Sequence, residues 1–178
     1  ILENDFYYKN IFRALSSGLL EKYNINLSYL MKAALELKIV AGYENWIESL
    51  LNAKQDSENN ESDSDETDNK HQKALNDINV LNDLLTPFNK KLTLKEFASS
   101  LIKFIHDSDL PLKFLSDRTG NEEVNIKALT TFIDTLRELF TLLEREYGEE
   151  KKFSLSFFLG HLRTMVSAVR YNVKEKPN

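Results

Sequence analysis

The residues that could take part in catalysis or hold a metal are few and far apart in this sequence. The three histidines, His71, His106 and His161, form no His-Glu-x-x-His pair, the spacing that places two zinc ligands on one helix face. The absence of cysteine excludes thiolate zinc sites, iron–sulfur clusters, disulfides and cysteine nucleophiles. We therefore expect no metal and no cofactor, and we expect the histidines to fill surface or core positions.

Two acidic patterns suggest metal chemistry but lack the residues that it needs. Glu36-Leu37-Lys38 matches the Glu-x-Lys half of a metal-dependent nuclease site, in which carboxylates hold a divalent ion and a lysine positions water. That half-motif belongs on a strand, whereas here it lies in a helical pattern. The acidic run of residues 56–69 lacks the register of glycine and glutamate that an EF-hand calcium loop requires. We interpret this run as solvated.

The motifs of nucleotide-binding enzymes and of serine hydrolases are also missing. The five glycines are scattered, so the sequence contains neither a GxxxxGK[ST] phosphate loop nor a GxGxxG motif. The serines stand in no nucleophile-elbow context. This chain alone is therefore predicted not to be an enzyme.

The charge of the chain is segregated along its length. Its 178 residues carry a net charge of −5, but residues 56–69 hold seven acids and no base, and the remainder balances to +2. The last 28 residues contain six bases and one acid. Segregation of this kind indicates an anionic partner for the C-terminal end. The alternative is a solvated helix face followed by a disordered tail.

Basic residues near the C-terminus are the candidates for binding phosphates. The four candidates are Arg163, Arg170, Lys174 and Lys176. Arg163 and Arg170 lie seven residues apart, so they share one face of a predicted helix, and the two lysines extend that face. Such a helix contacts a nucleic-acid backbone without reading bases. The alternative is that the two arginines pair with acids of the preceding helix (Glu138, Glu144 or Glu146).

Helical periodicity dominates the chain, because apolar residues recur every three or four positions. We expect an all-α, irregular multi-helix bundle of about seven helices. Their approximate ranges are 4–23, 27–39, 43–53, 72–85, 94–106, 126–147 and 154–171. Residues 56–70 are predicted to form a long, acidic, disordered loop, because they carry no apolar residue to bury. It separates an N-terminal helical unit, 1–55, from a C-terminal bundle, 71–178, and we expect the two to pack as one domain.

Several local signals define these elements more closely. Thr93 and Glu96 match a capping box, Gly148 a helix C-cap and Ser154 a helix N-cap. A heptad pattern of apolar residues runs from residue 126 to residue 147, which favours the central helix of a bundle over a dimeric coiled coil. Trp46 is expected in a core rather than stacked on a base. No internal repeat of fixed period is present.

The sequence shows no targeting or membrane segment. No apolar run approaches the roughly 20 residues that span a bilayer. The N-terminal ILENDFYYKN lacks the basic region and apolar core of a signal peptide. With the absence of cysteine, this predicts a cytoplasmic protein. The missing initiator methionine and the linker-like YNVKEKPN end suggest a piece of a longer chain.

A series of short motifs resembles a known family in its order. The motifs are SGLL (17–20), GYENWIESL (42–50), LNDLL (81–85), LTLKEFA (92–98) and FSLSFFL (153–159), followed by Arg170-Tyr171. This order resembles the helical accessory domain inserted in superfamily I helicase-like subunits of the AddAB and RecBCD type. In that family a Gly-x-x-x-Trp segment, a T-L-x-E-F/W-A helix start and an S-L-x-x-F-L final helix recur in this order.

The resemblance implies a non-catalytic accessory domain of a DNA-repair and recombination helicase–nuclease. Such a domain guides DNA by backbone contacts and packs against neighbouring domains or a partner subunit, while the ATP and nuclease sites lie elsewhere. It therefore transfers no catalytic residue to this chain. The acidic spacer departs from the family pattern and would repel phosphates, which argues against DNA contact by the first half. The alternative function is a free-standing helical protein–protein interaction adaptor that recognises a partner helix.

Overall fold

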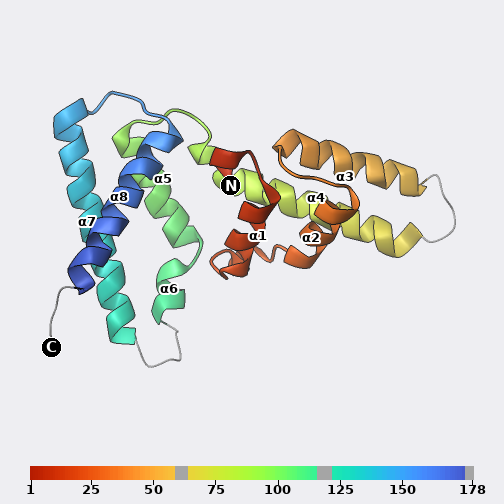
Figure 1. Ribbon diagram of the computed structural model, residues 1–178, viewed down its shortest axis with the longest axis horizontal. Helices are drawn as coiled ribbons and strands as arrows, with labels where there is room; N and C mark the ends of the chain where they lie inside the picture. The colour runs from red at the N-terminus through yellow and green to blue at the C-terminus, as the bar shows by residue number, and fades with distance from the viewer. Residues whose placement is uncertain (59–63, 116–121, 175–178) are drawn as a thin grey trace. The chain divides into compact units, whose positions relative to one another are not determined.

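The computed structural model describes residues 1–58, 64–115 and 122–174, and over these residues the protein is all-α (Figure 1). Eight α-helices and three short 3-10 helices account for the described secondary structure, with no strand. An isolated antiparallel bridge joins Leu92 to Phe153. The chain divides into two compact units, Ile1–Pro87 and Phe88–Asn178.

Among the residues that the structure describes, each unit contains four α-helices. The first unit contains α1 (Tyr8–Ser16), α2 (Leu27–Glu36), α3 (Tyr43–Glu58) and α4 (Ser64–Leu85), with the 3-10 helices η1 (Leu2–Asn4) and η2 (Glu21–Tyr23). The second unit contains α5 (Leu94–Asp107), α6 (Leu110–Leu115), α7 (Glu122–Tyr147) and α8 (Leu155–Lys174), and η3 (Thr86–Phe88) leads into it. The helix predicted over 4–23 is interrupted. It ends at Ser16 because Gly18 adopts a φ of 72°, which an α-helix does not allow.

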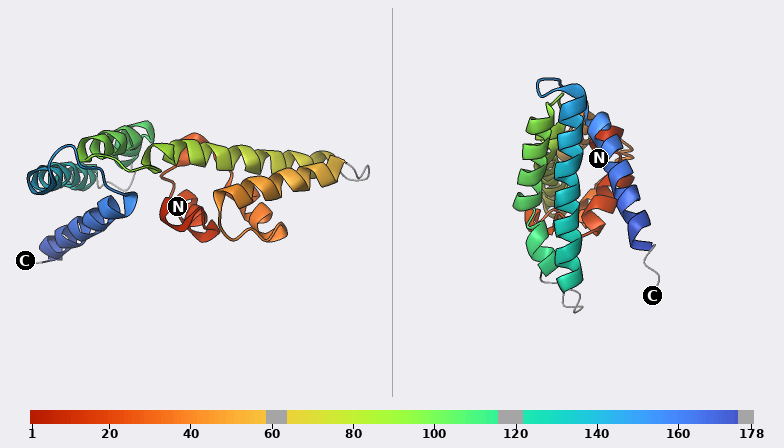
Figure 2. Two further views of the ribbon diagram at one scale, coloured as in Figure 1. Left: turned by 90° about the horizontal axis from the view of Figure 1, so that it is seen from above. Right: turned by 90° about the vertical axis from the view of Figure 1, so that its left-hand side faces the viewer.

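The first unit is organised around α3 and α4, which lie side by side and run antiparallel (Figures 1 and 2). Its core contains Ile11, Leu30, Trp46, Leu50, Ile78 and Leu81, all at most 1% exposed. The indole N–H of Trp46 donates a hydrogen bond to the carbonyl oxygen of Phe6 at 3.0 Å. Trp46 is therefore a core residue, as predicted.

The acidic segment is more helical than the sequence suggested. Of residues 56–70, predicted as a disordered loop, 56–58 belong to α3 and 64–70 belong to α4, while 59–63 lie outside the described residues. The packing of α3 on α4 favours continued helix. The boundary between the two compact units lies after α4, between Pro87 and Phe88.

Helices α5, α7 and α8 belong to the second unit (Figure 2), and aromatic rings form a core among them. The rings of Phe97 and Phe158 stack with centroids 3.9 Å apart and an angle of 2° between their planes. The rings of Phe140 of α7 and of Phe88 also contact Phe97, with centroids 6.1 and 5.7 Å from its centroid. Contacts of this kind tie three helices to one another.

Of the predicted signals at the ends of these helices, the capping box and the Gly148 C-cap are confirmed, and the Ser154 N-cap stays a prediction. The Thr93 hydroxyl accepts a hydrogen bond from the Glu96 N–H, and the Glu96 carboxylate accepts one from the Thr93 N–H, which completes the capping box. Gly148 ends α7 with a φ of 81°. Ser154 directly precedes α8, and its hydroxyl lies 2.8 Å from that of Ser156.

The apolar face of α7 is narrower than the predicted heptad pattern, and α8 likewise exposes one of its apolar residues. On α7 the heptad positions Leu136 and Leu143 are buried, whereas Ile126 is 45% exposed. On α8 Phe158 and Met165 are buried, whereas Val166 is 40% exposed. A helix has 3.6 residues per turn, so Met165 lies on the same face as Phe158, while Val166 lies to one side of that face.

None of the described helices has the length and apolar character of a membrane span.

Candidate functional site

The predicted phosphate contacts belong to α8 and the residues that follow it. Arg163 is exposed on this helix. Arg170 and Lys174 occupy helical positions seven and eleven residues further on, which places all three on one helix face. Lys176 lies outside the described residues. The structure thus brings three of the four predicted residues onto one helix.

The residues of α8 favour approach by an anion. From Leu155 to Lys174 the helix contains no aspartate or glutamate. Several of its exposed residues are small, namely Ser156, Gly160, Thr164, Ser167 and Ala168. The hydroxyls of Thr164 and Ser167 donate to carbonyl oxygens of their own helix, at 3.1 and 2.9 Å. Over its described side chains, α8 therefore exposes mostly small residues, and the helix itself contributes no negative charge.

Gly160 lies inside α8 without a conformational reason to be glycine. Its φ is not positive, and an added Cβ would meet no heavy atom within 4 Å. We expect Gly160→Ala to raise the free energy of unfolding by about 0.5–1 kcal/mol, because alanine loses less backbone entropy in a helix. Urea denaturation followed by circular dichroism measures this change.

Gly148→Ala is the matched control, because Gly148 is equally open but has a φ of 81°. There the same methyl group should lower the free energy of unfolding by about 1–2 kcal/mol, the cost of a left-handed backbone for an L-residue. Equal effects of the two substitutions would contradict this account of α8.

Additional lysines lie where the Leu92–Phe153 bridge joins two distant segments. The bridge has N–O distances of 3.0 and 2.8 Å. Lys90 and Lys91 directly precede Leu92, and Lys151 and Lys152 directly precede Phe153. All four lysines are exposed. Sequence reasoning counted Lys151 and Lys152 among the C-terminal bases but missed Lys90 and Lys91, since nothing local shows that residues about sixty apart are paired.

Within the described residues, the side chains considered for metal binding do not gather at one site. His71 is buried between helices of the first unit, with its Nε2 3.6 Å from an oxygen of Glu36. His161 packs on Phe157, with ring centroids 4.5 Å apart. Within the described residues, no three histidine, aspartate or glutamate side chains lie close enough together to hold a metal ion. Glu36-Leu37-Lys38 lies at the C-terminal end of α2, not on a strand.

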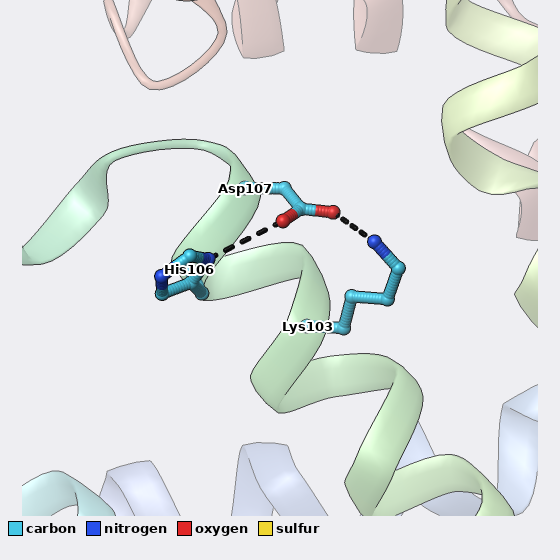
Figure 3. Close-up of polar contacts among 3 residues, drawn as sticks. All are labelled: Lys103, His106 and Asp107. Carbon is cyan, nitrogen blue, oxygen red and sulfur yellow. Dashed lines mark hydrogen bonds and ion pairs between the residues drawn. The ribbon is translucent and has the colours of Figure 1, made fainter.

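His106 belongs to a surface network on the last turn of α5 (Figure 3). Asp107 accepts from Lys103 through one carboxylate oxygen, and its other oxygen lies 3.3 Å from His106 Nδ1. The hydrogen bond from Lys103, followed by that from His106, holds the pKa of Asp107 below its ordinary value. Because the lysine and histidine side chains are largely exposed, this network resembles an ordinary surface ion pair.

A polar hollow of about 600 Å³ lies in the first unit beside the start of α2. Asp77 lines it and accepts a hydrogen bond from the Asn26 N–H at 2.9 Å. Partial burial raises the pKa of Asp77, and the Asn26 hydrogen bond offsets part of that rise. The Lys73 ammonium lies 5.5 Å from the centre of the Tyr29 ring in the same hollow. An acid and a base thus share this hollow, and it favours neither sign of ligand.

The geometry singles out α8 and the segment before it as the part of the described chain most suited to an anionic partner. Comparisons of the chain with protein-family models, with curated proteins and with solved structures found no match. The candidate site therefore depends on the residues themselves and on the motif resemblance.

Proposed function

We propose that the protein is a non-catalytic helical accessory domain of a DNA-repair and recombination helicase–nuclease. It contacts the DNA backbone through its second unit and packs against neighbouring domains or a partner subunit. The observation that carries the proposal is the division of charge between the units. Residues 1–87 carry 8 lysines and arginines against 15 acids, whereas residues 88–178 carry 15 against 13.

Physical considerations assign the DNA contact to the second unit. A first unit with a net charge of −7 repels phosphates, and a second unit with +2 attracts them. Within the second unit, α8 combines basic positions with an absence of acids. The motifs of the resemblance support the same proposal, because LTLKEFA and FSLSFFL span the starts of α5 and α8.

Arg170→Glu tests the proposal, because it reverses a charge in the middle of the basic face of α8. We expect the wild-type protein to bind a labelled DNA duplex with an affinity that falls steeply with salt concentration. We expect the variant to lose most of this binding while remaining folded. Fluorescence anisotropy over a salt series measures both effects, and circular dichroism checks the fold.

Arg145→Glu is the control, because Arg145 is an exposed arginine in the last turn of α7 rather than on α8. It makes the same change of charge elsewhere in the same unit and should leave most of the DNA affinity intact. Two results would contradict contact through α8. The first is a wild-type DNA affinity that does not change with salt concentration, and the second is an equal loss of DNA affinity in Arg170→Glu and Arg145→Glu.

A protein–protein adaptor is the second candidate, and exposed apolar residues on α2 favour it. Met31 and Leu35 lie one turn apart and are 42% and 73% exposed, and the nearby Val40 is 57% exposed. Binding through such a surface should be nearly insensitive to salt.

The size of the native polypeptide on an immunoblot of source-cell extract separates the two candidates. A band several times 20.7 kDa supports the accessory domain, and a band near 20.7 kDa supports the adaptor.

A further inference from the structure

A five-residue pattern occurs twice in the second unit. Residues 90–94 read KKLTL and residues 151–155 read KKFSL. Each copy contains two lysines, an apolar residue, a hydroxyl residue and the first leucine of a helix, α5 in one case and α8 in the other. We call the two copies together the paired lysine motif. The similarity extends from sequence to position, since both copies lead directly into a long helix.

The structure pairs the two copies with each other. Leu92 and Phe153, the apolar residues at the middle of each copy, form the antiparallel bridge and are 3% and 9% exposed. Successive residues of an extended segment point to opposite sides. Lys91 and Lys152 therefore lie on the solvent side when their neighbours face the core, and both are exposed. In an antiparallel pair these diagonal positions are about 7–8 Å apart, so two long side chains there reach a common group.

The positive charge of the paired lysine motif affects a neighbouring carboxylate. The pKa of Glu96 lies below its ordinary value, first because its carboxylate accepts the Thr93 N–H and further because of the positive charges of Lys152 and Lys90. The Glu96 carboxylate is thus affected by a lysine from each copy of the motif. The Lys151 ammonium lies over the rings of Tyr147 and Phe153, 5.1 and 5.4 Å from their centres. Glu149 and Glu150 are exposed just before the second copy and moderate the charge.

We propose that the paired lysine motif is a second contact point for nucleic-acid phosphates, at the opposite end of α8 from Arg170 and Lys174. This inference rests on the proposed function and adds the path that the DNA takes. Helix α8 begins at the motif and spans 20 residues, about 30 Å at 1.5 Å per residue. With phosphates every 3.4 Å along each strand, a duplex lying along α8 reaches both ends over roughly nine base pairs.

A nucleic acid fits this surface better than an acidic peptide does. The two basic ends are separated by a helix whose exposed residues are mostly small, which suits a regular polyanion lying along it. A bound peptide helix would need an apolar groove for its anchor residues. Val166 is the one large hydrophobic residue of α8 that is strongly exposed among its described side chains.

The test is DNA binding by the double variant Lys91→Gln/Lys152→Gln, measured by fluorescence anisotropy with a labelled duplex of about twenty base pairs. We expect the affinity to fall by roughly tenfold, as for the loss of two exposed ionic contacts. The slope of log K against log salt should become shallower by about 1.8, which is 0.9 for each lost phosphate contact. Lys91→Arg/Lys152→Arg keeps the charges and should bind as the wild type does.

The matched control is Lys127→Gln/Arg145→Gln, which removes the same charge from exposed positions of α7 and should leave the slope unchanged. If the lysine variant binds as tightly and with the same slope as the wild type while Arg170→Glu weakens binding, the inference is wrong and the proposed function stands. If the wild type binds no DNA, both are wrong. If polyglutamate displaces the duplex at equal charge concentration, the surface recognises acidic peptide and the inference is overturned.

Discussion

Replacing Trp46 with alanine is expected to lower the free energy of unfolding by about 3–5 kcal/mol, enough to unfold the first unit in a marginally stable protein. Trp46 is fully buried and is the largest side chain of the core. Its removal leaves a cavity that the remaining core side chains, Leu50 and Ile78 among them, fill only in part. Urea denaturation followed by far-ultraviolet circular dichroism measures the change, since the variant lacks the chain's single tryptophan.

Trp46→Phe separates the packing contribution from the hydrogen bond. Phenylalanine keeps most of the apolar volume but cannot donate to the Phe6 carbonyl oxygen, which the indole N–H reaches at 3.0 Å. We expect this variant to be less stable than the wild type by about 1–3 kcal/mol, the cost of a buried acceptor without a partner together with some lost packing. A Trp46→Ala protein as stable as the wild type would show that the first unit is not built around this residue.

The sequence predicted those features whose cause lies within a few residues. The capping box of Thr93 and Glu96 needs two side chains three positions apart, and Gly148 needs a positive φ directly after a helix. The burial of Trp46 follows from its place in an apolar helical pattern. Each of these depends on local geometry that the residue types themselves specify.

Other features depend on partners far away in the sequence. The acidic run looks unable to order itself, yet parts of it are helical where α3 packs on α4. The break at Ser17 and Gly18 was hidden by an apolar pattern that continues across it. The pairing of residues 90–94 with residues 151–155 escapes a search for periodic repeats, because two copies sixty-one positions apart establish no period. Only the bridge makes Lys90 and Lys91 neighbours of the start of α8.

Replacing Phe158 with alanine is expected to loosen α8 and lower the free energy of unfolding by about 3–5 kcal/mol. Phe158 is 2% exposed, stacks on Phe97 at 3.9 Å and meets Phe153 at 6.1 Å. It therefore connects α8 both to α5 and to the bridge that pairs the lysines. The loss should appear in circular dichroism, and Trp46 fluorescence reports the first unit of the same sample separately.

This substitution also distinguishes a positioned binding surface from a merely charged one. Phe158→Ala changes no charge, so binding that depended on net charge alone would persist in the folded variant. If the two basic ends of α8 act together, loss of its anchor should weaken DNA binding and make its salt dependence shallower, as substitution of the lysines does. Phe158→Leu keeps most of the apolar volume but loses the stacking on Phe97, so it should be less destabilised than Phe158→Ala and retain most of the affinity. DNA binding unchanged in a destabilised Phe158→Ala protein would mean that phosphates are held without the packing of α8 against α5.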